Sequence, residues 1–231
     1  MRIYVGGLPQ EPEPPLNYQI VYSLEGVLDY YTTRSWVLRN SKQTQVKALS
    51  EREPVKFDFA ELEAFHTAGG LSTMAQRYEG KIPTMEYKTL RYPGHAEIMQ
   101  TIRELGLLDL EPVEVKGVMV SPRDLFVTVV GPKLTKPKGK DLLALRVIVR
   151  GSKDGRPAER RFDLVDRYDE KHGISAMMRT TGYSLSITGQ MQARGEVTPP
   201  GVWTPDECMP PKEYIAALRA RGIDLKETVS A

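Results

Sequence analysis

Apolar and polar positions along the chain predict several short strands mixed with helices. Strands are expected where β-branched and aromatic residues cluster or alternate with charged residues. These segments are RIYVGG near the start, YQIVYSLEGVLDYY, WVLRN, VKFDF at 55–59, MEYKTLRY, DLLALRVIVRG and ERRFDLVDRY. The last two flank the turn sequence SKDGRP and predict an antiparallel pair. LEGVLDYY has a helical turn as its alternative, and the prolines of GGLPQEPEPPLNY predict irregular structure.

Four stretches combine helical spacing of apolar residues with signals for helix ends. They are HAEIMQTIRELG, with Pro93 as first helical residue and a stop at Gly106; LFVTVVGPKL, capped by Ser121 and Pro122 and ended at Gly131-Pro132; residues 174–195, a long buried helix stopped by Gly195; and KEYIAALRARG, which follows Pro210-Pro211 and stops at Gly222. The first helix carries an apolar stripe expected to lie in the core, formed by Ile98, Met99, Ile102 and Leu105.

The order of these elements sets the fold class. Strands and helices do not alternate in a strict βαβ rhythm, and no internal repeat is present. This favours an α+β fold with a mixed, largely antiparallel sheet and helices packed on it. A length of 231 residues suits one large domain or two small ones.

Composition and charge exclude several classes of function. The chain is 40% hydrophobic and 27% charged with a net charge of +2, which gives no reason to expect nucleic acid or a membrane as partner. The single cysteine, Cys208, cannot form an intramolecular disulfide, so a reducing cytoplasm is expected. The start of the chain is not a signal peptide, and no apolar run approaches the ~20 residues that span a bilayer.

Familiar cofactor and metal motifs are incomplete. VGGLPQEP lacks the third glycine of a dinucleotide fingerprint, and its prolines forbid the helix that would follow. GPKLTKPKGKD has its glycines too far apart for a phosphate loop and reads as a solvated loop. The candidate zinc ligands His66, His95, His172 and Cys208 stand singly, without the paired spacing of a zinc site. Packing or capping is the better interpretation of His66 and His172.

The stretch KTLRYPGH, residues 88–95, is the best candidate for a site. Arg91 at the end of a strand offers a planar fork that pairs with a carboxylate, and His95 lies in the first turn of a helix, whose dipole favours neutral imidazole. Strand alternation places Lys88, Leu90 and Tyr92 on one face, and Thr89 and Arg91 on the other. From spacing alone, a structural turn with solvated charges is the favoured alternative.

Six ordered segments resemble the C-terminal half of the saccharopine dehydrogenase-like oxidoreductases, and among them the lysine 6-dehydrogenases. They are GGLPQEPEPPLNY at 6–18, EAFHTAGGLST at 63–73, KTLRYPGH at 88–95, SPR at 121–123, DEKHGISAMMRTTGY at 169–183 and GEVTPPGVWTPDE at 195–207. The resemblance implies a substrate-binding and dimerisation domain at 1–173, and C-terminal segments at 174–231 that pack on a Rossmann domain. That Rossmann half is missing here, so a truncated chain, a split subunit or a fragment is expected.

The resemblance also implies a chemistry and its residues. The activity would be oxidative deamination of L-lysine at its 6-amino group with NAD or NADP, which no motif in this chain would hold. Thr89, Leu90 and Arg91 match a substrate-contacting tripeptide of saccharopine reductases. Arg91 would clamp the α-carboxylate and Tyr92 would orient the substrate, while His95 or a desolvated Lys88 would accept a proton.

Substrate and assembly follow from the same resemblance. Saccharopine enzymes carry an arginine near the position of Gly70, suited to a second carboxylate, and its loss here favours a smaller amino acid such as lysine. The expected partners are the amino-acid substrate and further copies of the chain in a homo-oligomer. Two alternatives stay open: a saccharopine or carboxynorspermidine dehydrogenase-type substrate, and a non-catalytic dimerisation or amino-acid-binding module.

Overall fold

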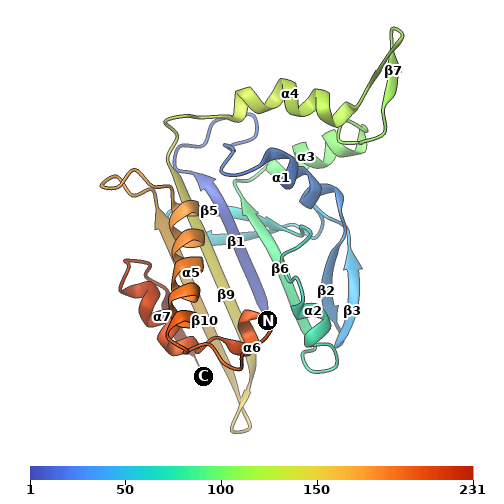
Figure 1. Cartoon of the computed structure of the whole chain (residues 1–231). Helices are drawn as coiled ribbons and strands as arrows, with labels where there is room; N and C mark the ends of the chain where they lie inside the picture. Colours follow the sequence, from blue (N-terminus) through green and yellow to red (C-terminus); the bar gives the residue numbers. More distant parts are fainter. Residues whose placement is uncertain (231) are drawn as a thin grey trace.

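One long sheet organises the chain (Figure 1), and the computed structural model describes residues 1–230. Its nine strands follow the order β11-β10-β9-β1-β6-β2-β3, with β5 joining β6 and β4 joining β5. Their bounds are β1 Arg2–Pro9, β2 Ser35–Arg39, β3 Lys42–Val46, β4 Glu53–Phe57, β5 Ala60–Phe65, β6 Thr84–Arg91, β9 Asp141–Lys153, β10 Arg156–Arg167 and β11 Lys226–Ser230. A separate hairpin, β7 Val113–Val115 with β8 Val118–Val120, projects from the body.

The sheet is mixed and largely antiparallel, which confirms the predicted fold class. Among the strand pairs of residues 1–230, only β1 and β6 run parallel, with Val5 opposite Thr89. The predicted pair at SKDGRP is confirmed as the hairpin β9–β10. Asp154 and Gly155 turn it with positive φ angles of 53° and 75°, which an Asp-Gly pair adopts at low cost.

Within residues 1–230, seven helices cover the sheet and its upper end. Their bounds are α1 Leu24–Thr32, α2 Met74–Arg77, α3 His95–Glu104, α4 Pro122–Leu134, α5 Ala176–Ala193, α6 Pro205–Cys208 and α7 Pro211–Arg219. The four predicted helices are confirmed in α3, α4, α5 and α7, and Ser121 caps α4 by accepting the Asp124 N–H at 3.3 Å. No helix in residues 1–230 combines the length and apolar character needed to cross a membrane.

Helix α1 corrects the strand predicted over YQIVYSLEGVLDYY. Ser23 caps the helix by accepting the Gly26 N–H at 3.2 Å. The buried side chains of α1 fall at helical spacing, namely Leu24, Val27, Leu28 and Tyr31. They pack with α3 and α4 in one core cluster. Burial against two other helices therefore decided between two local conformations that the sequence left nearly equal.

Three element ends also differ from prediction. Strand β1 continues through the glycines to Pro9, because Gly6 has no side chain. A Cβ at Gly6 would lie 2.4 Å from the Leu90 carbonyl oxygen, so glycine allows the close approach of β6. Helix α3 begins at His95, after Gly94 as N-cap with φ 92°, and not at Pro93. Its final stripe residue, Leu105, is the C-cap and is 70% exposed. Helix α4 runs past Gly131-Pro132 to Leu134.

The C-terminal segments pack on strands of the same sheet. Helix α5 lies along β9 and β10, and β11 pairs with β10. Ala176 and Ile223 join Leu143 and Leu164 in one buried cluster. The predicted long helix is confirmed, but its burial is only partial, because only one face of α5 is buried. The predicted docking of residues 174–231 on a Rossmann domain stays a prediction, and its last residue lies outside the described part.

Candidate functional site

Strand β6 sends its side chains to two faces, as alternation predicts. Lys88 is buried on one face, where its Nζ donates to Glu53 Oε1 at 2.9 Å and to the Glu51 carbonyl oxygen at 2.6 Å. Burial acts to raise the pKa of the Glu53 carboxyl, but the Lys88 ammonium and the Tyr4 phenol outweigh it, so this pKa is lowered. Lys88 thus belongs to a partly buried ion pair on the face of β6 that points away from Arg91.

Leu90 and Tyr92 lie on the same face as Lys88. Leu90 is fully buried in the core cluster between β1, β5, β6 and β9. The Tyr92 hydroxyl donates to the Pro9 carbonyl oxygen at 2.9 Å, which joins the end of β6 to the end of β1. Both residues therefore serve packing in this structure, and the roles predicted for them as substrate contacts remain predictions.

Arg91 lies on the opposite face as a buried cation. It is 4% exposed, its guanidinium carbon sits 4.9 Å from the centre of the Tyr18 ring, and its Nη1 donates to the Leu90 carbonyl oxygen at 2.8 Å. Its Nε has no hydrogen-bond partner. Within residues 1–230 no carboxylate forms an ion pair with it. A buried charge without a counterion is expensive, and an anion bound on this face of β6 would offset that cost.

Glu63 is the acidic residue opposite Arg91 across the β5–β6 pair. Its carboxylate is already engaged, because Oε1 accepts the Ala96 N–H at 2.6 Å at the start of α3. No ion pair forms between the two side chains within residues 1–230, and the Nε of Arg91 is left without a partner.

His95 is buried beside Arg91 as a neutral ring. Its Nδ1 lies 3.0 Å from the Leu16 carbonyl oxygen, and because a carbonyl only accepts, Nδ1 carries the proton. Its Nε2 then accepts from the Tyr31 hydroxyl at 2.9 Å. Burial, and then the Arg91 guanidinium, lower the pKa of His95 to about 3. This ring positions Tyr31 and holds no free lone pair for an incoming proton.

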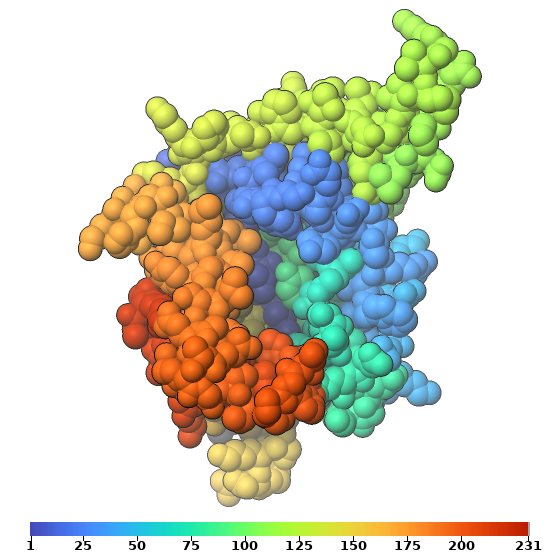
Figure 2. All heavy atoms as spheres, viewed as in Figure 1, coloured from blue at the N-terminus to red at the C-terminus, as the bar shows by residue number. Residues whose placement is uncertain are grey.

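A cavity of about 250 Å³ opens beside Thr89 on the Arg91 face. It is lined by Tyr22, Tyr30, Thr67, Ala68, Gly69, Gly70, Tyr87 and Thr89. Figure 2 shows the molecule hollowed here, between the blue and teal segments on one side and the orange helix α5 on the other. The Thr67 and Thr89 hydroxyls are hydrogen-bonded at 2.7 Å. None of the lining side chains is charged.

Sequence reasoning missed the tyrosines of this cavity. Tyr22 and Tyr30 stand in the segment predicted as a strand, whereas Tyr30 lies in helix α1 and Tyr22 lies just before its N-cap. Burial raises the pKa of Tyr22 to about 12, and it also raises the pKa of Tyr31 and Tyr87. These phenols are therefore protonated at neutral pH, and they can donate hydrogen bonds but do not act as bases.

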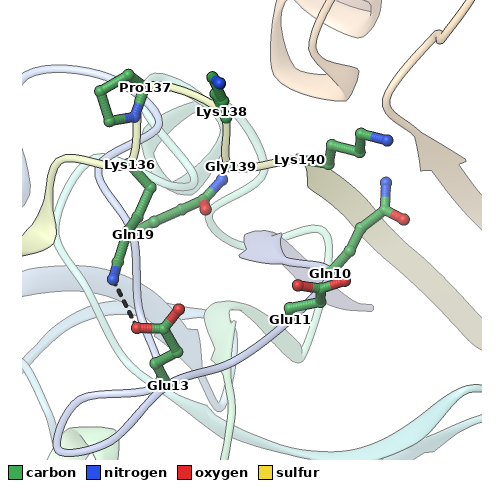
Figure 3. Close-up of a pocket in the computed structure, with 9 residues that line it drawn as sticks. All are labelled: Gln10, Glu11, Glu13, Gln19, Lys136, Pro137, Lys138, Gly139 and Lys140. Carbon is green, nitrogen blue, oxygen red and sulfur yellow. Dashed lines mark hydrogen bonds and ion pairs between the residues drawn. The ribbon is translucent and has the colours of Figure 1, made fainter.

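A larger cavity, of about 660 Å³, lies elsewhere, at the loop that was compared with a phosphate loop above. Figure 3 shows its lysines and glutamates around Gln10 and Gln19. Lys136 pairs with Glu13 at 2.5 Å, and Lys140 pairs with Glu170 at 2.5 Å. Because these cations already have counterions, the loop has the character of a solvated surface, as predicted.

A cluster of possible metal ligands, Glu51, His66 and Glu86, lies near the other end of β6, with its ligand atoms within 4.8 Å of one another. Arg39 already bridges the two carboxylates, with both contacts at 2.7 Å, and Arg2 adds a third at 2.9 Å. The guanidinium groups of Arg39 and Arg2 neutralise the carboxylate charge that would otherwise attract a metal cation. The cluster is therefore an ion-pair network that fastens β2 to β6.

The mixed sheet, with an uncharged cavity on the face that carries a buried guanidinium, defines an α+β domain with a candidate anion site. Residues 1–223 match the model of the saccharopine dehydrogenase C-terminal domain, and the chain belongs to this family. The predicted relationship to saccharopine dehydrogenase-like oxidoreductases is confirmed at this level. The finer assignment to lysine 6-dehydrogenase stays a prediction.

One solved structure shares the fold of this chain. Apo saccharopine dehydrogenase (L-Glu forming) from Saccharomyces cerevisiae superposes with a TM-score of 0.77 at 19% sequence identity. The match covers 100% of this chain and 66% of the yeast chain. At this identity the likeness establishes a shared fold, and the chain spans about two thirds of the length of that protein.

Proposed function

We propose that this chain is the substrate-binding domain of an NAD(P)-dependent amino-acid oxidoreductase that deaminates L-lysine at its 6-amino group. The observation that carries the proposal is Arg91, a buried guanidinium with a free Nε and no carboxylate partner in residues 1–230. Family membership supports the oxidoreductase relationship. The substrate, the activity and the roles of single residues are our inference.

The α-carboxylate of an amino acid would supply the missing counterion. A guanidinium binds a carboxylate through parallel N–H donors, and such a pair is strongest where water is excluded. Arg91 has that environment, with aromatic walls from Tyr18 and the neutral ring of His95 around it. A ligand bound this way would also relieve the cost of a buried, unpaired charge.

Thr89 connects the guanidinium to the cavity. It lies two residues before Arg91 on the same face of β6 and lines the cavity with Thr67. A ligand whose carboxylate reaches Arg91 would therefore pass Thr89 and lay its side chain in the cavity. The cavity offers no second cation, which favours a monocarboxylate over saccharopine or a carboxylated polyamine.

His95 has a positioning role in this proposal. Its low pKa and its two hydrogen bonds disfavour proton acceptance near neutral pH, whereas its Nε2 holds the Tyr31 phenol next to Arg91. Lys88 faces away from the cavity and is held by Glu53. The group that accepts the proton during deamination is then neither of these two residues.

The described residues do not fit a nicotinamide cofactor. Gly6 and Gly7 lie inside β1, paired with β9, so their N–H groups do not open a helix toward a pyrophosphate. NAD or NADP would thus be held by a nucleotide-binding unit other than residues 1–230. We keep the predicted homo-oligomer and the predicted cytoplasmic location as parts of the proposal.

The test is calorimetric titration of the chain with L-lysine. Arg91→Lys keeps the charge but removes the fork, and we expect at least a tenfold loss of lysine affinity with the fold retained by circular dichroism. Arg194→Lys is the matched control, because Arg194 is exposed and pairs only with Glu196. Equal lysine affinity in wild type and Arg91→Lys would overturn the proposal.

A further inference from the structure

The upper edge of the molecule carries a concentration of exposed apolar side chains. Nine of the nineteen large apolar side chains that are exposed within residues 1–230 fall between 105 and 129. This segment contains the C-cap of α3, the β7–β8 hairpin and most of α4, and Figure 2 shows it along the top of the molecule. Exposed apolar residues are normal where they are scattered, but a contiguous group of this size marks an interaction site.

The β7–β8 hairpin presents valines on one face. Val113 is opposite Val120 and Val115 is opposite Val118, so the four side chains share that face. Val113, Val115 and Val118 are 48–61% exposed, because the hairpin projects from the body (Figure 1). A two-stranded hairpin by itself is marginally stable in water at best, and packing of its apolar face is what stabilises it. The valine face is therefore expected to pack on a partner.

Helix α4 is apolar on its inner side and on its outer side. Phe126, Val127 and Val130 pack on the core cluster that also holds residues of α1 and α3. Leu125 and Val129, one helical turn apart, are 53% and 51% exposed on the outer side. A helix that is apolar all round is typical of a buried position, so the outer side of α4 is also expected to be covered in the assembled protein.

Charges of opposite sign lie at the two ends of this region. The hairpin end has one lysine, Lys116 at the turn, and four exposed acidic residues, which are Asp109, Glu111, Glu114 and Asp124. The other end, about 20 Å away along the 13 residues of α4, has Lys133 and Lys138. Within residues 1–230 none of these seven groups forms an ion pair, since the salt bridges of the region use other residues.

We propose that the β7–β8 hairpin and the outer side of α4, together called the α4 surface, form the contact between two copies of the chain. The copies are related by a two-fold axis near the middle of α4, with the two α4 helices antiparallel. This places the acidic end of each copy on the lysine end of its partner. The inference rests on the proposed function only for the homo-oligomer, whose contact surface it names, and it does not involve Arg91.

A second copy fits the α4 surface better than the nucleotide-binding unit does. The segments predicted to pack on that unit are residues 174–231, and α5 lies along β9 and β10, whereas α4 lies at the upper end of the sheet (Figure 1). A two-fold contact requires a surface that complements itself, and acidic residues at one end with lysines at the other meet this requirement. An apolar centre with a charged rim is also the usual composition of an interface.

Sedimentation velocity of the chain over a range of concentrations tests the α4 surface, and we expect a dimer. Val129→Arg brings two like charges together near the two-fold axis, so dimerisation should weaken at least tenfold. The circular dichroism spectrum should not change, because the side chain is on the outer side of α4. Leu185→Arg is the matched control, since Leu185 is 75% exposed on α5, outside the α4 surface, and it should leave dimerisation unchanged.

Charge reversal tests the two-fold arrangement. Reversing the acidic end with Glu111→Lys and Glu114→Lys, or the lysine end with Lys133→Glu and Lys138→Glu, should weaken the dimer by about 5- to 50-fold. A chain that carries all four substitutions should recover dimerisation to within about threefold of wild type, because each reversed end then meets the reversed opposite end of its partner. An unlike partner would give no such recovery.

The outcomes separate the α4 surface from the function on which it rests. If the wild-type chain is a dimer and Val129→Arg dimerises as tightly as Leu185→Arg, the α4 surface is refuted and the homo-oligomer stands. If both reversals weaken the dimer and the fourfold variant does not recover, the two-fold arrangement is refuted. If the wild-type chain is monomeric at every concentration, the inference and the homo-oligomer fail together, while titration with L-lysine still decides the role of Arg91.

Discussion

Replacing Arg91 with methionine should stabilise the ligand-free chain while it abolishes carboxylate binding. The guanidinium is 4% exposed, it makes one hydrogen bond to a carbonyl oxygen, and it has no carboxylate partner in residues 1–230. Methionine fills a similar elongated volume without a charge. The substitution therefore exchanges a costly buried cation for an apolar side chain.

The magnitude follows from three opposing terms at Arg91. An unpaired buried ion costs several kcal/mol after relaxation of its surroundings. Against this, the bond to the Leu90 carbonyl contributes about 1.5–3 kcal/mol and the contact with the Tyr18 ring about 0.5–2 kcal/mol. We expect a net gain of about 1–3 kcal/mol in the free energy of unfolding.

Urea unfolding followed by circular dichroism measures this difference, and a thermal scan should show a rise of about 2–4 °C per kcal/mol for a chain of this size. Arg103→Met is the matched control, because Arg103 donates to the carbonyl oxygens of Tyr31 and Ala48, at 3.1 and 2.9 Å. That variant should lose stability. If Arg91→Met is less stable than wild type by more than ~1 kcal/mol, the present contacts of Arg91 already compensate its burial and the argument for a missing anion is refuted.

Two further predictions concern the neighbours of Arg91 on β6 and α3. The pKa of His95 is lowered to about 3 in the folded chain, so the folded state binds fewer protons than the unfolded state, and its stability should be full above about pH 6.5 and decline by roughly 3–5 kcal/mol toward pH 3. Urea unfolding at pH 7 and pH 4 measures this, and a His95→Gln variant with the same pH slope as wild type would contradict it. Lys88→Met leaves Glu53 without its buried partner and should cost about 1–3 kcal/mol of stability, with lysine affinity unchanged by calorimetry because the two faces of β6 are separate. A loss of lysine affinity in that variant would place Lys88 in the site.

Turn and cap residues in the sequence predicted the elements whose conformation is set by residues close to them in the chain. The hairpin β9–β10 has strand-forming residues on both sides of an Asp-Gly turn, and α4 has a serine cap followed by proline. Such signals act within a few residues, and no distant partner is needed to select the conformation. The order of β1 and β6 at the centre of the sheet could not be predicted this way, since their parallel pairing joins residues far apart in sequence.

The sequence alone determined which side chains of KTLRYPGH share a face, because alternation is a property of any strand. It therefore separated Lys88 from Arg91 before the fold was known. Only the tertiary structure decided that Arg91 is buried without a counterion, that His95 is neutral, and that Gly70 supports Tyr87 beside a cavity. Burial and charge balance depend on groups that distant segments bring together, and no spacing rule along the chain contains them.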